Sequence, residues 1–162
     1  MRKNTVFSLL ISGAFSFSPY LFAQADLNTK ILKTYSTIHK ALAGDKVSEA
    51  QSLAQGGLAD LTDWLKSPKP EQAENVKKME LGAQQLAQSK TDEESRKAFG
   101  LYSEGTVSFI RADSDAKTKW QLFYCPMVPK GTYGYWVQPK GDSLLNPYYG
   151  SKMLTCGVKR PW

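Results

Sequence analysis

The chain has 162 residues, a formal net charge of +6, two cysteines and one histidine. A single histidine excludes metal sites that need two, and the lack of any Glu-x-x-His sequence excludes the di-iron pattern of helical bundles. The residues from Asp26 to Trp162 are enough for one domain with its own core.

The first 25 residues have the pattern of a secretory signal peptide. Arg2 and Lys3 precede an apolar stretch from Thr5 to Phe22, and the small residues Ala23 and Ala25 follow it. Small residues at these places are typical of a signal-peptidase site. We therefore expect a signal peptide over residues 1–25 and a periplasmic mature chain with no integral membrane span. A retained membrane anchor is the weaker interpretation, because Ser, Gly and Pro residues interrupt the apolar stretch.

Residues 26–115 carry four stretches whose apolar side chains recur at the spacing of amphipathic helices. The stretches cover residues 27–42, 47–65, 71–86 and 92 to about 113. Asp26 and Asp45 are the expected N-caps of the first two helices, and Thr91 with Glu94 forms a capping box for the fourth. Because the connections are short, consecutive helices should be antiparallel neighbours, which predicts a mainly α fold with an up-down four-helix bundle.

Two adjacent glycines, Gly56 and Gly57, lie within the second helical stretch. Glycine is about 1 kcal/mol less favourable than alanine inside a helix. Their presence therefore indicates a bend or a close contact with another helix at this point.

Residues 116–162 differ from the bundle in composition. They hold seven basic residues and one acidic residue, Asp142, together with nine of the 14 aromatic residues found after residue 25. Residues 120–124 have the aromatic content of a short strand, and Gly and Pro residues divide the rest of this segment into turns and extended pieces. We expect an aromatic-rich C-terminal extension of short strands and turns, packed on the bundle as part of one structural domain. Trp136 and either Tyr148 or Tyr149 are its expected anchors.

The basic excess of this extension is also compatible with a nucleic-acid-binding face. Its lysines, however, are scattered singly among the aromatic residues, and an exported protein rarely meets nucleic acid. We therefore interpret these charges as a solvated surface and predict no nucleic-acid partner.

Both cysteines and two of the four methionines lie in two short pieces of the extension. Cys125-Pro126-Met127 is one piece, and Met153-Leu154-Thr155-Cys156 is the other. Thiolate and thioether ligands select Cu(I), whereas zinc usually takes more Cys, His or carboxylate ligands than these pieces supply. The pattern predicts a soft-metal site whose ligands are Cys125, Met127, Met153 and Cys156.

The same two cysteines support a second interpretation. In an oxidising compartment, two cysteines in a small domain commonly form a disulfide. A bridge between Cys125 and Cys156 would stabilise the fold by roughly 3–4 kcal/mol in the chain-entropy model. A disulfide does not need a thioether beside each sulfur, so the methionines favour the metal site. A thiol–disulfide enzyme is a third and weaker hypothesis, because the sequence has no Cys-x-x-Cys motif.

Three other residues have roles that the helical pattern alone leaves open. His39 lies beside the apolar stripe of the first helix, and we interpret it as a boundary residue hydrogen-bonded to a neighbour rather than as a ligand. Met79 in the third helix is expected in the core, where methionine commonly fills irregular gaps. Arg96, early in the fourth helix, is either a surface charge or a link that pins the extension through backbone carbonyl groups.

An ordered set of residues in the extension also resembles a known family. The set consists of Tyr124 to Met127, Tyr135-Trp136, Asn146 to Gly150 and Met153 to Gly157. It resembles a family of exported bacterial helical domains of undefined activity, found alone or fused to periplasmic membrane-fusion subunits of heavy-metal efflux systems. Arg96 and Phe99 also fall at family-like places, so the resemblance covers nearly all of residues 26–162. It implies a helical bundle with a Cys/Met tail and an association with copper or silver handling.

We therefore expect a periplasmic, non-enzymatic module that binds Cu(I) or Ag(I) and buffers the metal or passes it to a partner. The partner would be a heavy-metal efflux membrane-fusion protein or a metallochaperone. Pro126 would stiffen the first ligand loop, and Asn146-Pro147 would turn the chain towards it. Trp136 and the tyrosines, Tyr148 among them, would shield the metal from water and oxidant. The alternative is a disulfide-stapled adaptor that binds a protein partner through its aromatic, basic extension.

Overall fold

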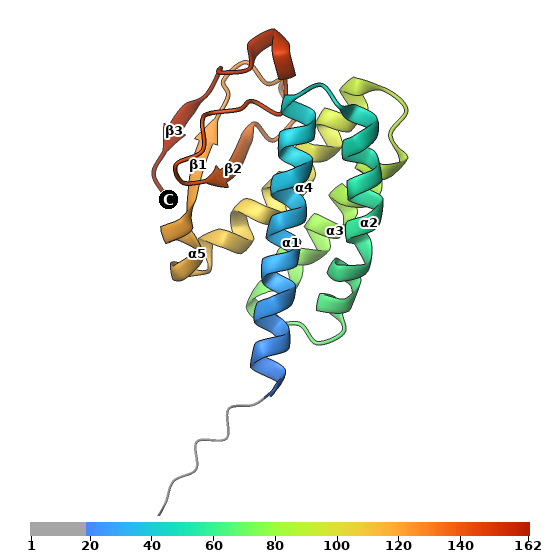
Figure 1. Cartoon of the computed structure of the whole chain (residues 1–162), viewed down its shortest axis with the longest axis vertical. Coiled ribbons are helices and arrows are strands. Elements are labelled where there is room, and N and C mark those ends of the chain that lie inside the picture. Colours follow the sequence, from blue (N-terminus) through green and yellow to red (C-terminus); the bar gives the residue numbers. More distant parts are fainter. Residues whose placement is uncertain (1–18) are drawn as a thin grey trace, which may run out of the picture.

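The computed structural model of the chain describes residues 19–162, and it is mainly helical. Four long helices form the bundle, and a small antiparallel sheet lies beside it at the C-terminal end of the chain (Figure 1). The helices of the bundle are α1 (Pro19–Ala43), α2 (Val47–Leu65), α3 (Pro70–Gln88) and α4 (Asp92–Arg111). The predicted fold class, a mainly α bundle followed by short strands and turns, is confirmed.

The first helix begins earlier than its apolar stripe predicted. α1 starts at Pro19, so Asp26 lies inside the helix, where it pairs with Lys30 over 2.9 Å. The prediction of Asp26 as an N-cap is therefore wrong. Residues 20–25 contain Leu, Ala and Gln, which favour helix, and proline is tolerated in a first turn. Most of the predicted signal peptide, residues 1–18, lies outside the described residues.

The other two predicted caps have different outcomes. Thr91 is the N-cap of α4, and its side-chain oxygen accepts a hydrogen bond from the backbone N–H of Glu94 over 3.1 Å. The N-cap of α2 is Lys46, so the prediction of Asp45 is wrong. Asp45 instead has a φ of 57°, in the left-handed region that Asp tolerates better than most residues. Its carboxylate is used elsewhere, by Arg96 and by the extension.

The glycine pair in α2 marks a close contact, not a break. α2 runs without interruption from Val47 to Leu65. A Cβ atom added to Gly57 would lie only 2.7 Å from the Cγ2 atom of Thr34 on α1, so α1 and α2 approach closely there. A Cβ added to Gly56 would meet nothing within 4 Å. Of the two glycines, only Gly57 is required by the packing.

A short helix that the sequence patterns did not predict spans the junction between the bundle and the extension. α5 (Ser114–Lys119) is capped by Asp113, whose carboxylate accepts from the backbone N–H groups of Asp115 and Ala116. The strands that come after it are β1 (Trp120–Tyr124), β2 (Tyr135–Pro139) and β3 (Val158–Arg160), with a 3₁₀ turn η1 (Gly150–Met153) before β3. β1 is the central strand, antiparallel to both neighbours, so the strand predicted over residues 120–124 is confirmed.

A chain of hydrogen bonds at Tyr35 joins the bundle to the sheet. Val137 N–H donates to the Tyr35 hydroxyl over 3.3 Å, and that hydroxyl lies 2.7 Å from Ser103 Oγ. Ser103 donates its only proton to the carbonyl oxygen of Tyr135 over 2.9 Å, so the Tyr35 hydroxyl must donate to Ser103. The chain runs from β2 through α1 and α4 back to β2. The extension therefore docks in one orientation, with Tyr35 also stacked on Phe99.

Candidate functional site

The two cysteines meet at one edge of the sheet. Cys125 directly follows β1, and Cys156 lies two residues before β3. β1 and β3 are antiparallel, and Tyr124 is paired with Val158, so the end of one strand faces the start of the other. The two Sγ atoms lie 3.4 Å apart and both cysteines are free thiols. Cys125 is fully buried and Cys156 is partly exposed. A buried thiol and a partly exposed thiol therefore lie side by side at the edge of the sheet.

The first cysteine leads into a tight turn. Val128 N–H donates to the carbonyl oxygen of Cys125 over 3.4 Å, which places Pro126 at the second position of the turn, where its fixed φ is favoured. Met127 occupies the third position, and its side chain is 55% exposed. The hydroxyl of Tyr149 donates to the backbone carbonyl of Met127. Pro126 thus lies in a tight turn, and Tyr149, four residues before Met153, is hydrogen-bonded to that turn.

The second cysteine closes a turn with the methionine that precedes it. Cys156 N–H donates to the carbonyl oxygen of Met153 over 2.9 Å. Residues three apart lie on the same side of a 3₁₀-like turn, so this bond places Met153 beside Cys156 in the local structure. The side chain of Met153 is 37% exposed. The structure thus brings two of the four predicted ligands, the thiols, into contact, while both methionines are exposed residues.

Asn146 holds the segment between residues 146 and 156 in shape. Its side chain is fully buried. Its Nδ2 donates to the Cys156 carbonyl over 2.7 Å, and its Oδ1 accepts from the N–H groups of Tyr148 and Tyr149. Its backbone N–H donates to the Leu154 carbonyl over 2.7 Å. One residue therefore closes the loop that presents Cys156.

Trp136 packs against the backbone beside the site. Its indole ring is fully buried, stacks on Phe123 with centroids 5.5 Å apart, and meets Tyr148 edge-on at 6.0 Å. A Cβ atom added to Gly157 would lie 2.5 Å from the far edge of this indole. Gly157 is thus required because the tryptophan approaches the chain next to Cys156. The predicted anchors Trp136 and Tyr148 are both buried in the extension's core.

Arg96, on α4, links the extension to the bundle by hydrogen bonds to both. The guanidinium donates to the carbonyl oxygens of Pro147 over 2.7 Å and Leu42 over 3.0 Å, and it pairs with Asp45 and Asp92. Arg96 as a whole residue is only 8% exposed. Of the two roles that the sequence left open for Arg96, the structure shows the link through backbone carbonyl groups.

His39 is more deeply placed than the boundary position that we predicted. It is buried, and its Nε2 donates to the Leu145 carbonyl over 2.8 Å. Burial lowers the pKa of His39 to about 4, so the ring is neutral at physiological pH. Nδ1 has no hydrogen-bond partner among the described residues. Met79, as predicted, is a fully buried core residue.

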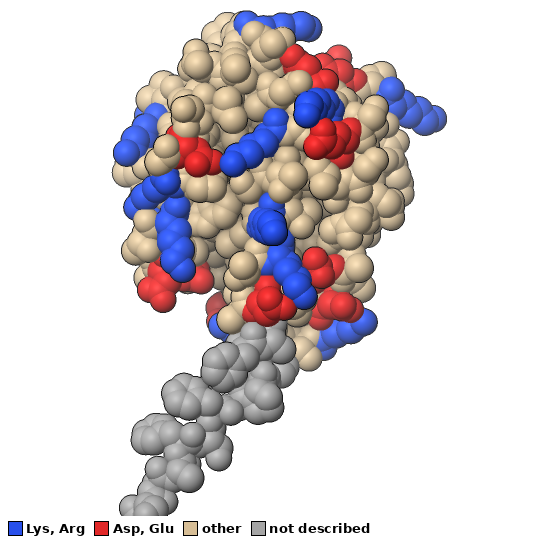
Figure 2. All heavy atoms as spheres, viewed as in Figure 1, with Lys and Arg blue, Asp and Glu red and all other residues tan. Residues whose placement is uncertain are grey.

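Charged side chains of both signs lie on the surface, and the pKa of one thiol is raised by its neighbour. Lysine, arginine and acidic side chains are mixed over the face seen in Figure 2, without one dominant patch. The one acidic residue of residues 116–162, Asp142, pairs with Lys40 over 3.0 Å. The hydrogen bond with Cys125, followed by burial and charge repulsion, raises the pKa of the Cys156 thiol. Cys156 is therefore protonated at neutral pH when nothing is bound to it.

The donor chemistry of the site fits a soft cation better than a hard one. Within residues 19–162, no group of three or more His, Cys, Asp or Glu side chains comes together. The two thiols, 3.4 Å apart, are strong donors for a soft cation. Thiolates and thioethers are the ligand types that Cu(I) prefers.

In the part of the chain that the structure describes, no helix is long and apolar enough to cross a membrane.

Sequence reasoning missed several residues that shape the site. Asp45 was expected at a helix start, but its carboxylate accepts from Ser151 N–H over 3.0 Å at the start of η1. Tyr149 was expected only as a packing anchor, and its hydroxyl joins the Cys125–Met127 turn to the chain that leads into η1. A left-handed Asp in a helix connection and a tyrosine in a turn-rich segment are common in proteins. Neither carried a signal strong enough to assign these bonds.

The fold and the site define a class of molecule: a helical bundle whose C-terminal sheet presents a paired, partly accessible dithiol. Comparison with family models, with curated proteins and with solved structures finds nothing that matches this chain. The family resemblance drawn from the sequence therefore stays a prediction.

Proposed function

We propose that this chain is a non-enzymatic module that binds one Cu(I) or Ag(I) ion as cargo through Cys125 and Cys156. The observation that carries the proposal is the 3.4 Å separation of the two Sγ atoms, with one thiol buried and the other reachable from solvent. Metal–thiolate bonds of about 2.3 Å, as for zinc, let two sulfurs on one metal lie up to about 4.6 Å apart. The pair is therefore already within the range that a shared cation requires.

Met127 and Met153 are the proposed thioether ligands that complete the set. Both belong to the turns that carry the thiols, and both side chains are exposed, so they are free to close over a bound ion. Tyr149, through the Met127 carbonyl, keeps the two turns together while the side chains move. This arrangement supports capture and release of a cation, because the backbone is held and only side chains must rearrange.

The physiological role that we propose is periplasmic buffering of the metal or its transfer to an efflux partner. It rests on the signal-like N-terminus, on the family resemblance and on the partial exposure of Cys156. A partly exposed Cys156 is what ligand exchange with another protein's thiol or thioether groups requires, because the incoming ligand must reach the metal before the first ligand leaves.

The alternative is a structural disulfide in an adaptor domain. The same proximity favours it, since an oxidant that accepts two electrons and two protons would join Cys125 and Cys156 after a small movement. The extension would then bind a protein partner through its aromatic and basic side chains. In that case the thioethers have no chemical task, and only their packing matters.

A Cu(I) titration in competition with a chromophoric chelator separates the two functions. The reduced chain should take up one equivalent, and Cys156→Ser should abolish binding that the chelator can measure. Met127→Leu with Met153→Leu should weaken binding at least about tenfold, because a soft donor is lost at each position. Met79→Leu is the matched control, since Met79 lies in the core of the bundle, and it should bind as the unchanged chain does.

Two results would count against the metal site. Uptake that is unchanged in Cys156→Ser would remove the thiol pair from the function. If the cysteines instead stay joined in a disulfide that does not react with Cu(I), and both Met→Leu changes leave the protein unaltered, the disulfide-stapled adaptor is supported.

A further inference from the structure

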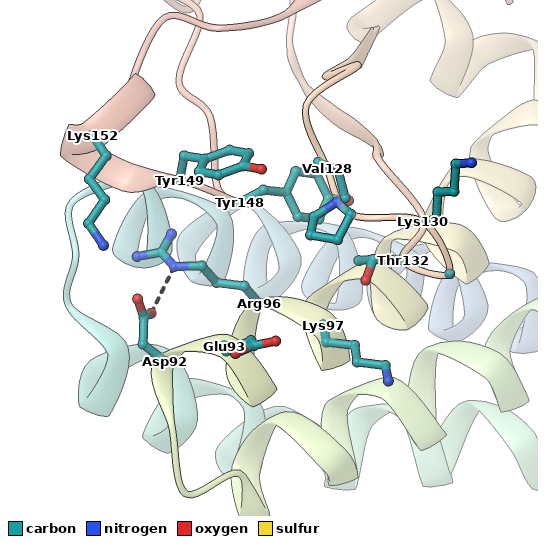
Figure 3. A pocket seen from close by; sticks show the side chains of 12 residues that line it. Asp92, Glu93, Arg96, Lys97, Val128, Lys130, Thr132, Tyr148, Tyr149 and Lys152 are labelled. Atoms are coloured by element: carbon teal, nitrogen blue, oxygen red, sulfur yellow. Dashed lines mark hydrogen bonds and ion pairs between the residues drawn. The ribbon is translucent and has the colours of Figure 1, made fainter.

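A cleft with a different chemistry lies between the start of α4 and the extension. Its volume is about 350 Å³, within the range of pockets that hold small ligands. Figure 3 shows Asp92, Glu93, Arg96 and Lys97 on the helix side, with Tyr148, Tyr149 and Val128 facing them from the extension. The cleft is separate from the thiol pair, because neither cysteine lines it.

The lining of the cleft carries an excess of positive charge. Four basic residues and two carboxylates line it. One carboxylate, Asp92, is held by the guanidinium of Arg96 over 2.8 Å. In the described chain, none of the three lysines that line the cleft has an ion-pair partner, and these lysines are Lys97, Lys130 and Lys152. The cleft thus offers ammonium groups that an anion would satisfy.

The wall opposite α4 has an apolar part, and two of its residues are hydrogen-bonded within the extension. Tyr148 and Tyr149 use their hydroxyl groups within the extension, on the carbonyls of Tyr135 and Met127, so their rings are what the wall presents. Val128 and Pro129 continue this wall. Arg96 cannot move freely, since it donates four hydrogen bonds. A preformed cleft loses little conformational freedom when a ligand enters it.

We propose that this cleft binds a small organic carboxylate, with the apolar body of the ligand on the Tyr149 and Val128 wall and its carboxylate among the lysine ammonium groups. A ligand with charge alone would leave the apolar wall wet, and a purely apolar ligand would leave the lysines unpaired. A carboxylate with an aromatic or short aliphatic body satisfies both. The proposal does not depend on metal binding by Cys125 and Cys156.

Titration of the ¹⁵N-labelled, reduced chain with benzoate, followed by amide chemical shifts, tests the proposal. Benzoate should cause saturable shifts in residues 92–97, 128–132 and 148–152. Benzamide, which has the same shape without the charge, should bind at least about tenfold more weakly. The triple variant Lys97→Ala, Lys130→Ala, Lys152→Ala should lose about tenfold in benzoate affinity, since exposed charges each contribute modestly.

The matched control removes the same charge elsewhere. The control is the triple variant Lys69→Ala, Lys117→Ala, Lys159→Ala, whose three lysines do not line the cleft. It should bind benzoate as the unchanged chain does. The proposal is overturned if benzoate causes no saturable shifts, if both triple variants lose affinity equally, or if benzamide binds as tightly. Shifts centred instead on Arg111, Tyr133 and Arg160, which line another hollow of the surface, would overturn it as well.

Discussion

The side-chain amide of Asn146 donates a hydrogen bond to the carbonyl oxygen of Cys156 over 2.7 Å. The bond joins two residues that are ten positions apart in the chain, and it fixes the backbone of the partly exposed cysteine. The same side chain accepts from the N–H groups of Tyr148 and Tyr149, one of which carries the hydroxyl that holds Met127. Asn146 is therefore the residue through which both sulfur segments are positioned.

Replacing Asn146 by alanine should destabilise the protein strongly. The change leaves the Cys156 carbonyl and the N–H groups of Tyr148 and Tyr149 without partners in a buried place. We expect a loss of about 3 kcal/mol in the free energy of unfolding, measured by urea denaturation. Asn75→Ala is the control. Asn75 is only partly buried, and its side-chain amide donates one hydrogen bond to Gln72 on the same helix. It should cost less than about 1 kcal/mol, and equal losses in the two variants would contradict the role of Asn146.

Arg96→Lys should also destabilise the protein, although it keeps the charge. A lysine ammonium cannot reproduce the forked contacts of the guanidinium with the carbonyls of Leu42 and Pro147 and with two carboxylates. We expect a loss of about 2 kcal/mol, since both carboxylates are partly exposed and screened. Amide hydrogen exchange should become faster around Tyr148 and Ser151. The exposed Arg111→Lys change should alter stability by less than about 0.5 kcal/mol, and a similarly mild effect at Arg96 would show that the link is dispensable.

The bundle was predictable because its signals are local. The apolar spacing of each helix and the Thr91 N-cap involve residues only three or four apart, and both match the structure. The second bond of the predicted capping box differs, because the Glu94 carboxylate accepts from Lys90 N–H instead of Thr91 N–H. The start of α1 was not predicted, because residues 19–25 fit a signal-peptide interpretation as well as a helix. α5 was missed because six residues after Asp113 are too few to show a helical period.

The thiol site was predictable in its residue types but not in its supports. The sequence pointed to Cys125 and Cys156, and the structure brings these thiols together. Their approach depends on the pairing of β1 with β3, which is set by contacts more than 30 residues apart. The bonds of Asn146, Tyr149 and Asp45 likewise join distant parts of the chain. No local pattern encodes such contacts, so they are determined only in the folded chain.

The stability of the protein should fall as the pH is lowered from about 6.5 to 4, partly because of His39. Burial lowers its pKa from 6.5 to about 4 in the folded chain, so the unfolded chain binds the proton more readily. The contribution of neutral His39 is present above pH 6.5 and is lost as the pH falls, by about 3 kcal/mol at pH 4. His39→Gln, which can still donate to the Leu145 carbonyl, should lose less stability over this interval. Urea denaturation at a series of pH values measures the free energy of unfolding of both proteins. If the two free energies fall in parallel with pH, His39 is not a source of the pH dependence.

Metal binding should become tighter as the pH rises through the neutral range. The raised pKa of Cys156 means that a cation must displace its proton, so binding releases protons. The apparent affinity for Cu(I) should therefore increase with pH, and calorimetry in buffers of different ionisation enthalpy should report proton release. An affinity that does not change with pH, in the absence of proton release, would mean that thiolates are not the ligands.

The central claim is that Cys125 and Cys156 hold a soft cation, and a native mass spectrum of the purified, natively folded protein tests it most directly. The sample is measured with and without added Cu(I), each followed by a thiol-blocking reagent. We predict a mass increased by one copper, with Cys156 protected from the reagent when the metal is bound and modified when it is absent. A mass lower by two hydrogens, with no response to Cu(I) and no reaction with the reagent, would contradict the claim and establish a structural disulfide in its place.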